Sequence, residues 1–254
     1  MRIVIITQNE PFYLTKSLNY LLDILPDHSK VVGCVVADVS PFGKRESFFT
    51  KAKKTYDIFG LKFFTYYSLK YLKSKANSKN NVFKFLKTSS IPIITLDDPI
   101  NNPQSVAKIK SFQPDLLVSI LGNQIFKAPI LNLAPKGCIN LHTALLPKYR
   151  GLMPTFWVLK NNEKYTGVSV FFVDKGIDSG SIIVQEKVEI GNRTQEELIS
   201  YTKKIGMECI SKSIDLIAKG TVELIENDAS KKTYFTFPTR EDVLEFKRNG
   251  KKFF

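Results

Sequence analysis

The chain has 254 residues, of which 43% are hydrophobic and 24% charged, and its formal net charge is +13. This length and composition predict a soluble globular protein with one large core and a smaller appendage. The apolar run at 3–6 is too short for a signal peptide, and no stretch approaches the roughly 18 apolar residues of a membrane-spanning helix. Because Cys34, Cys138 and Cys209 have no metal-type spacing, we expect a reduced, cytoplasmic protein without a metal site.

The first 37 residues have the pattern of a strand, a helix and a second strand. We expect strands at 2–7 and 31–37, with a helix at 13–25 whose leucines recur at helical spacing. This β-α-β start predicts an α/β fold with a doubly wound, mostly parallel, Rossmann-like sheet. The first turn, 8–11, has no glycine-rich fingerprint, which argues against a bound dinucleotide.

Residues 44–87 form a basic and aromatic insert. They hold twelve Lys and Arg against two acidic residues, which is +10 of the net +13, and they include eleven aromatic residues. The pattern predicts one or two amphipathic helices broken near Gly60, in a helical insert whose bounds we set at 44–90. We expect its polar segment 74–81 to be mobile.

Three interpretations of the insert remain open. Its lysines can form a solvated face while its aromatic residues pack inward. It can lie on an anionic membrane, because basic amphipathic helices with aromatic residues suit that interface. It can also attract an anionic acceptor, such as a nucleotide-linked sugar or tRNA.

The core resumes after the insert with strands at 91–95 and 115–121 and a helix near 103–112. The second of these strands is a continuous apolar run, which indicates a buried parallel strand. It ends in the loop 122–126, which in itself can be an ordinary strand-to-helix turn.

Two polar residues stand near the end of a strand at 137–142. The two-residue period of a strand puts Asn140 and His142 on one face, and the following Leu-Leu-Pro ends the strand. Cys138 can share that face as a thiol nucleophile, or it can be a small buried core residue. In an α/β protein, a polar pair at this end of a strand is where ligand sites usually form.

A second polar element follows the apolar strand 168–173. The loop 174–180 carries Asp178 and two glycines, which permit unusual backbone angles and close approach of a ligand to the main chain. Together, Asn140, His142 and Asp178 supply an amide donor, a titratable imidazole and a carboxylate.

The segment 137–186 resembles the folate-dependent formyltransferases, a family that includes methionyl-tRNA, glycinamide ribonucleotide and amino-sugar N-formyltransferases. The family has an Asn-x-His pair that runs into a Leu-Leu-Pro loop ending in Gly, followed by an aspartate in an Asp-x-x-x-Asp-x-Gly loop. Here His142 and Asp178 stand 36 residues apart, which fits the family spacing. Ala144 departs from the pattern, because a serine is common there, and this puts in doubt only the hydrogen bonding of the loop.

The resemblance implies N10-formyltetrahydrofolate as the cofactor and Asn140, His142 and Asp178 as the catalytic residues. An amine attacks the formyl carbon, and Asn140 and a protonated His142 stabilise the negative charge that develops on oxygen. Asp178 moves the proton from the amine to the leaving nitrogen. The resemblance also implies that two loops and one following residue cradle the pterin, namely Asn123, Gln124, Ile125, Phe126 and Leu131 with Asp174, Lys175, Gly176 and Ile177. Without it, Ile125, Phe126 and Leu131 read as plain core.

The sequence changes character after residue 190, so we divide the chain into a catalytic domain at 1–190 and an extension at 191–254. A capping box at 194–197 opens a helix that runs to Gly220. The segments 222–226 and 232–237 read as a hairpin, and a last short helix opens at 239. Family resemblance suggests that such a tail can form a homodimer.

The acceptor is inferred from family layout. The extension is too small for the barrel domain of methionyl-tRNA formyltransferases, and the first turn lacks the glycine-rich character of the glycinamide ribonucleotide branch. We therefore expect an N-formyltransferase acting on the amine of a nucleotide-linked amino sugar used in surface polysaccharide, such as lipopolysaccharide. The alternatives are a methionyl-tRNA formyltransferase-like enzyme, a non-catalytic protein that binds anionic lipid or acts as a scaffold, and a hydrolase that discards the formyl group.

Overall fold

In the computed structural model, the described residues are 1–37, 47–122 and 124–254. Their main sheet has seven strands in the order β3-β2-β1-β4-β5-β7-β8, parallel from β3 to β5 and antiparallel from β5 to β8. The strands are β1 (Arg2–Gln8), β2 (Lys30–Ala37), β3 (Ile93–Ile94), β4 (Leu116–Ser119), β5 (Cys138–His142), β7 (Tyr165–Phe172) and β8 (Ile182–Glu189). The expected doubly wound, mostly parallel sheet is confirmed.

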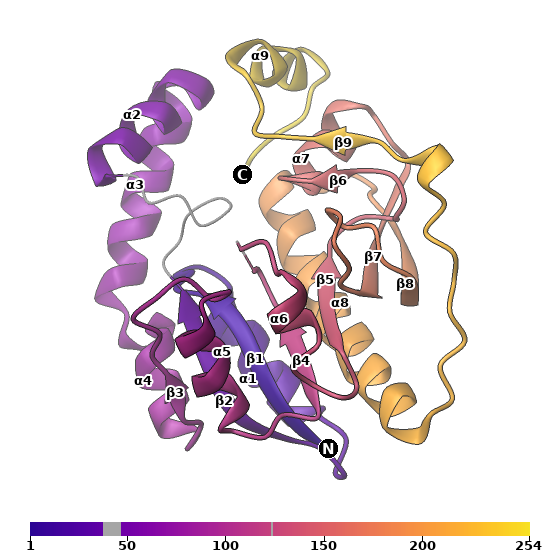
Figure 1. Ribbon diagram of the computed structural model, residues 1–254. Coiled ribbons are helices and arrows are strands. Elements are labelled where there is room, and N and C mark those ends of the chain that lie inside the picture. The colour runs from indigo at the N-terminus through magenta and orange to yellow at the C-terminus, as the bar shows by residue number, and fades with distance from the viewer. Residues whose placement is uncertain (38–46, 123) are drawn as a thin grey trace.

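Helices cover both faces of the sheet (Figure 1). On one face α1 (Leu14–Asp23), α4 (Val82–Thr88) and α8 (Gln195–Lys219) bury their apolar residues in the largest core cluster. On the other face lie α5 (Pro103–Lys110) and α6 (Ala128–Leu131). The helix α8 begins at the expected capping box and ends at Gly220, whose φ of 68° suits glycine. None of the described helices is long and apolar enough to cross a membrane.

The insert is helical, and its helices break at Gly60 as the sequence predicts. The helices α2 (Phe48–Phe59) and α3 (Leu61–Ala76) meet there, where φ is 83°. Residues 44–46 of the insert lie outside the described residues. The segment 74–81, which we expect to be mobile, contains the end of α3 and a 3₁₀ turn, and the buried Ser74 hydroxyl donates to the carbonyl of Pro11.

The C-terminal extension does not form the expected hairpin. Its strand β9 (Tyr234–Phe235) pairs with β6 (Arg150–Gly151) in a separate two-stranded parallel sheet. Ile225 instead forms an isolated bridge with Ile182 at the edge of the main sheet. The prediction fails because each of the two segments finds a different backbone partner in the body of the protein.

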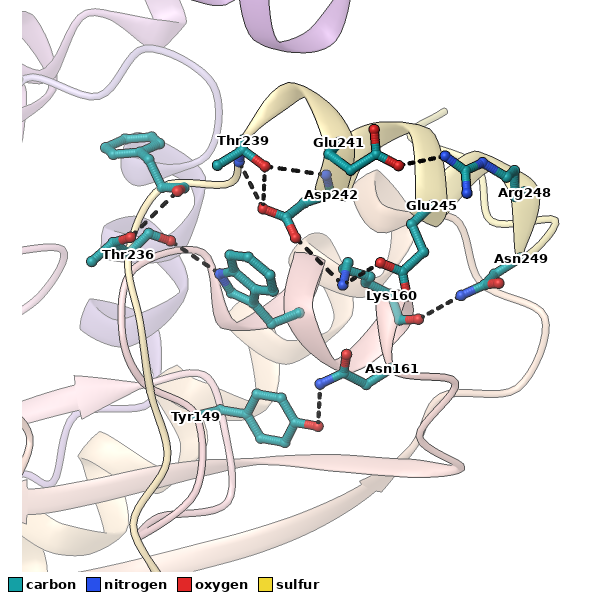
Figure 2. A network of polar contacts seen from close by, with 12 residues as sticks. Tyr149, Lys160, Asn161, Thr236, Thr239, Glu241, Asp242, Glu245, Arg248 and Asn249 are labelled. Carbon is teal, nitrogen blue, oxygen red and sulfur yellow. Dashed lines mark hydrogen bonds and ion pairs between the residues drawn. The ribbon is translucent and has the colours of Figure 1, made fainter.

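The extension packs on α7 (Pro154–Lys160) through its last helix, α9 (Arg240–Arg248). Figure 2 shows Lys160 between Asp242 and Glu245 of α9, with Nζ–oxygen distances of 3.4 and 2.7 Å. In the same region the Trp157 Nε1–H donates to the Thr236 carbonyl at 3.1 Å. A second core cluster of aromatic side chains joins α7, the extension and the insert, and includes Phe59, Phe156, Phe246 and Phe253. The insert is therefore fastened to the C-terminal end of the chain.

Candidate active site

A cavity of about 490 Å³ opens at the carboxyl end of the parallel strands. Asn140 and His142 reach it from β5, and Asp178 reaches it from the loop after β7. The other walls come from the ends of β1 and β4 and from α8. The structure thus brings the three predicted catalytic residues into one cavity, of the size in which small ligands usually bind.

Hydrogen bonding fixes the orientation of His142. Its ring is buried at 6% exposure, and Nε2 lies 2.7 Å from the carbonyl oxygen of Tyr149. A carbonyl oxygen only accepts, so Nε2 carries a proton. The other ring nitrogen, Nδ1, lies 3.5 Å from Oδ2 of Asp178. A proton on Nδ1 makes this contact attractive, whereas its loss sets a lone pair against a carboxylate.

Asp178 is held from two sides. Its Oδ2 accepts a hydrogen bond from the Gly151 N–H at 2.8 Å, so the Leu-Leu-Pro loop positions the carboxylate. The Asn227 side chain donates to the carbonyls of Asp178 and Gly180, both at 2.9 Å. Asp178 itself adopts a left-handed φ of 48°, a region that few non-glycine residues adopt, although aspartate tolerates it better than most. The extension, through Asn227, therefore helps to position the loop that carries Asp178.

The Asn140 side chain makes no hydrogen bond within the described part of the chain, although it lines the cavity beside His142. An amide left without a partner at a ligand cavity is free to donate its N–H to an oxygen of a bound molecule. The arrangement offers a neutral donor at Asn140 and a proton-bearing pair at His142 and Asp178. Such a site can stabilise negative charge that develops on oxygen and can move a proton.

Most of the residues expected to cradle a pterin line the same cavity. Gln124, Ile125 and Phe126 do so from the loop after β4, and Asp174, Gly176 and Ile177 do so from the loop after β7. Lys175 does not line it, and neither does Leu131, which lies at the end of α6 and packs against the core. Asn123 lies outside the described residues.

Several cavity residues have no signal in the sequence. They include Gln8 at the end of β1, Ser17 on α1 and Lys203 on α8. Lys203 lies 5.6 Å from the ring centre of Tyr13, and burial lowers the pKa of its ammonium group against the opposing effect of Glu10. Only the fold brings these distant helices to the cavity, so no local spacing could have identified them.

Cys138 is a core residue. It packs against the sheet face covered by α5 and α6 and does not line the cavity. Burial raises the pKa of its thiol to about 12, so it is not a thiolate near neutral pH. Of the two sequence interpretations, the structure supports the buried hydrophobe. Among the described residues, no group of three His, Cys, Asp or Glu side chains is placed to hold a metal ion.

Known proteins resemble this chain in sequence. The profile of the family described as "Formyl transferase" matches residues 69–214. The methionyl-tRNA formyltransferase of Kosmotoga olearia is 36% identical over 169 residues, covering 61% of this chain and 53% of the relative. That of Alkaliphilus oremlandii is 39% identical over 135 residues, covering 53% and 44%. The chain spans about half the length of the curated relatives it matches.

Solved structures share the fold at lower sequence identity. An N-formyltransferase from Helicobacter canadensis is 22% identical with a TM-score of 0.60, covering 95% of this chain and 72% of that one. A phosphoribosylglycinamide formyltransferase from Anaplasma phagocytophilum is 15% identical with a TM-score of 0.64, covering 94% and 99%. Since the family profile covers more than half of the sequence, the chain belongs to the formyl transferase family.

Proposed function

We propose that this protein transfers a formyl group from N10-formyltetrahydrofolate to a primary amine. The observation that carries the proposal is the Asn140 amide, which has no hydrogen-bond partner among the described residues, beside the His142–Asp178 pair in one cavity. The structure of the Helicobacter canadensis protein is described as a complex with folinic acid, a formylated folate. Residues 124–126 of one loop, with Asp174, Gly176 and Ile177 of the other, supply a wall of mixed apolar and polar groups that fits a pterin.

The residues divide the chemistry between them. Asn140 donates its N–H to the formyl oxygen as negative charge develops there, which is typically worth about 3–4 kcal/mol of the barrier. His142 adds positive charge close by while its Nε2–H stays on the Tyr149 carbonyl. Asp178 accepts the proton that the attacking amine loses and delivers it to the leaving nitrogen. The Gly151 N–H holds Oδ2 of Asp178, which leaves Oδ1 for this exchange.

For the acceptor, we propose the amine of a nucleotide-linked amino sugar that is used in surface polysaccharide. The Helicobacter canadensis protein, which aligns with 95% of this chain, is described in complex with dTDP-3-aminofucose. Ser17 and Lys203 line the cavity on the side of α1 and α8, and a cationic group there suits a diphosphate. The second candidate acceptor is methionyl-tRNA, because the curated relatives carry that name.

The test is formyl transfer from N10-formyltetrahydrofolate to a panel of nucleotide-linked amino sugars, with initiator methionyl-tRNA and a no-amine control beside them. Turnover on one sugar supports both the reaction and the acceptor. Transfer to the tRNA alone keeps the reaction and replaces the acceptor. Formate release without an amine identifies a hydrolase, and no turnover on any acceptor contradicts the proposal.

A further inference from the structure

The insert presents large apolar side chains to solvent. Phe49 is 82% exposed on α2, and Leu72 is 63% exposed on α3. Figure 1 shows α2 and α3 along one side of the molecule, with β7 and β8 on the opposite side. We define the insert surface as six of the exposed apolar side chains of these two helices: Phe48, Phe49, Tyr56, Leu61, Leu69 and Leu72.

On α3 these residues form one stripe. Leu61, Leu69 and Leu72 recur at intervals of eight and three, which places them on one face of a helix. The opposite face of α3 packs on the protein, because Phe63 stacks on Phe59 and Ser74 is buried. The leucine stripe is therefore not the core-facing side of the helix. A contiguous apolar face left in solvent usually marks an interaction site.

Lysines surround the apolar face. Residues 47–87 contain ten lysines and a single acidic residue, Asp57. Lys62 and Lys73 directly follow Leu61 and Leu72 in sequence, and both lysines are exposed. A long lysine side chain can lie along an apolar surface while its charged end stays in a polar layer. The surface thus combines an apolar face with a concentrated positive charge.

A cavity of about 720 Å³ opens beside this surface, between α2, α3 and residues 9–12. Its lining includes the exposed Phe48 and Leu72, the lysine Lys75, and Phe12 beneath them. The Phe12 and Tyr67 rings meet there at 5.0 Å. An apolar group can enter between the helices while an anionic group stays near the lysine.

The composition discriminates between the molecules that could cover such a surface. Protein interfaces are depleted of lysine, and a second copy would set two strongly positive surfaces against each other. Nucleic-acid sites favour arginine and do not require exposed leucines, whereas residues 47–87 contain no arginine. Basic helices with Phe and Leu on the other face are typical of the boundary between lipid headgroups and acyl chains. An anionic bilayer matches both the charge and the apolar face.

We propose that the insert surface docks this protein on anionic membranes. The apolar residues enter the headgroup boundary, and the lysines contact anionic headgroups. The turn at 8–11 lies between the two cavities. Gln8 lines the cavity of about 490 Å³ that holds Asn140, and Asn9 and Pro11 line the cavity of about 720 Å³ beside the insert. Docking therefore brings the catalytic cavity close to the membrane. The proposal does not depend on formyl transfer.

The test is co-sedimentation of the full chain with vesicles of phosphatidylcholine, with and without about 30% phosphatidylglycerol. We expect at least about tenfold stronger partition onto the anionic vesicles, and a drop of about fivefold or more when salt rises from about 0.1 to about 0.5 M. The double variant Phe49→Glu/Leu69→Glu should lose this binding, because both side chains are exposed and neither lines either of the two cavities described above. Leu224→Glu is the matched control, since Leu224 is an exposed leucine outside the insert.

Three results would overturn the proposal. One is equal partition onto neutral and anionic vesicles, and another is full binding by the double variant. The third is loss of binding in Leu224→Glu to the same extent. Light scattering and a tRNA gel shift are run on the same proteins. If the wild type does not bind vesicles but forms a dimer or a tRNA complex, and the double variant abolishes it, the surface belongs to that partner instead. Circular dichroism melts establish that each variant is folded.

Discussion

Asn227 offers the sharpest test of how the catalytic loop is positioned. Its Nδ2 donates to the carbonyls of Asp178 and Gly180, both at 2.9 Å. Its Oδ1 accepts from a guanidinium nitrogen of the buried Arg150 at 2.7 Å. The Asn227 side chain thus connects two loops. One carries Asp178, the proposed proton carrier, and the other holds the Asp178 carboxylate through the Gly151 N–H.

Removing this side chain should affect stability and turnover together. Two neutral hydrogen bonds and one to a charged group are lost in Asn227→Ala, so the free energy of unfolding should fall by about 3 kcal/mol. Freed from its restraint, Asp178 can leave its left-handed conformation, and a displacement of about 1 Å at a catalytic group can cost about a hundredfold in rate. We expect kcat to fall about 10- to 100-fold, with a smaller change in KM for the formyl donor.

A second variant separates the two effects. Asn227→Asp keeps an acceptor for Arg150 but replaces the donor to both loop carbonyls, so kcat should fall as in the alanine variant while stability falls less. Trp157→Phe is the control, because it removes a different hydrogen bond to the extension, the one that the Trp157 side chain of α7 donates to the Thr236 carbonyl. Steady-state formyl transfer and urea unfolding measure the outcomes. If Asn227→Ala keeps kcat within about twofold, or loses no more than Trp157→Phe does, the positioning argument fails.

Three further predictions concern single residues. Cys138→Ala should keep kcat within about twofold and lose about 1 kcal/mol of stability by urea unfolding, because the thiol is buried and away from the cavity; a large loss of kcat would revive the thiol nucleophile. Lys203→Met should raise the free energy of unfolding at neutral pH, because burial disfavours the ammonium form of Lys203 and lowers its pKa below the ordinary lysine value. That advantage should shrink as pH rises through this pKa, and a constant gap in urea titrations at several pH values would contradict the reasoning. Gly151→Ala should cost more than about 2 kcal/mol and reduce kcat, since φ is 96° and a Cβ would strike the Phe235 carbonyl; unchanged melting and turnover would show that the loop relaxes freely.

Much of the fold could be predicted because local and global signals agree. The alternating strand 137–142 and the continuous apolar run at 115–121 both appear as sheet strands, and the capping box at 194–197 opens α8. The hairpin prediction failed because backbone pairing partners are not encoded locally. Tyr234 pairs with Arg150, more than eighty residues away, and no turn chemistry in 227–231 forbids this.

The proposed catalytic residues could be named because a resemblance joined two distant loops. The groups that hold these residues in position could not be predicted in the same way. Gly151 and Asn227 reach Asp178 through a backbone N–H and a side chain in the extension, and such contacts leave no spacing pattern. Lys203 reaches the cavity only because α8 crosses the sheet beside α1. Leu131, expected in the cradle, lies in the core instead.

The central claim is that the Asn140 amide and the His142–Asp178 pair carry formyl transfer. The most direct measurement is single-turnover transfer of a labelled formyl group from N10-formyltetrahydrofolate to the best acceptor, by the wild type, Asn140→Ala and Asp178→Asn. We expect a rate about 10²- to 10³-fold lower for Asn140→Ala, with the formyl donor still bound and the protein still folded. We expect a loss for Asp178→Asn as well, because an amide cannot carry the proton. Transfer at the wild-type rate by either variant would contradict this claim.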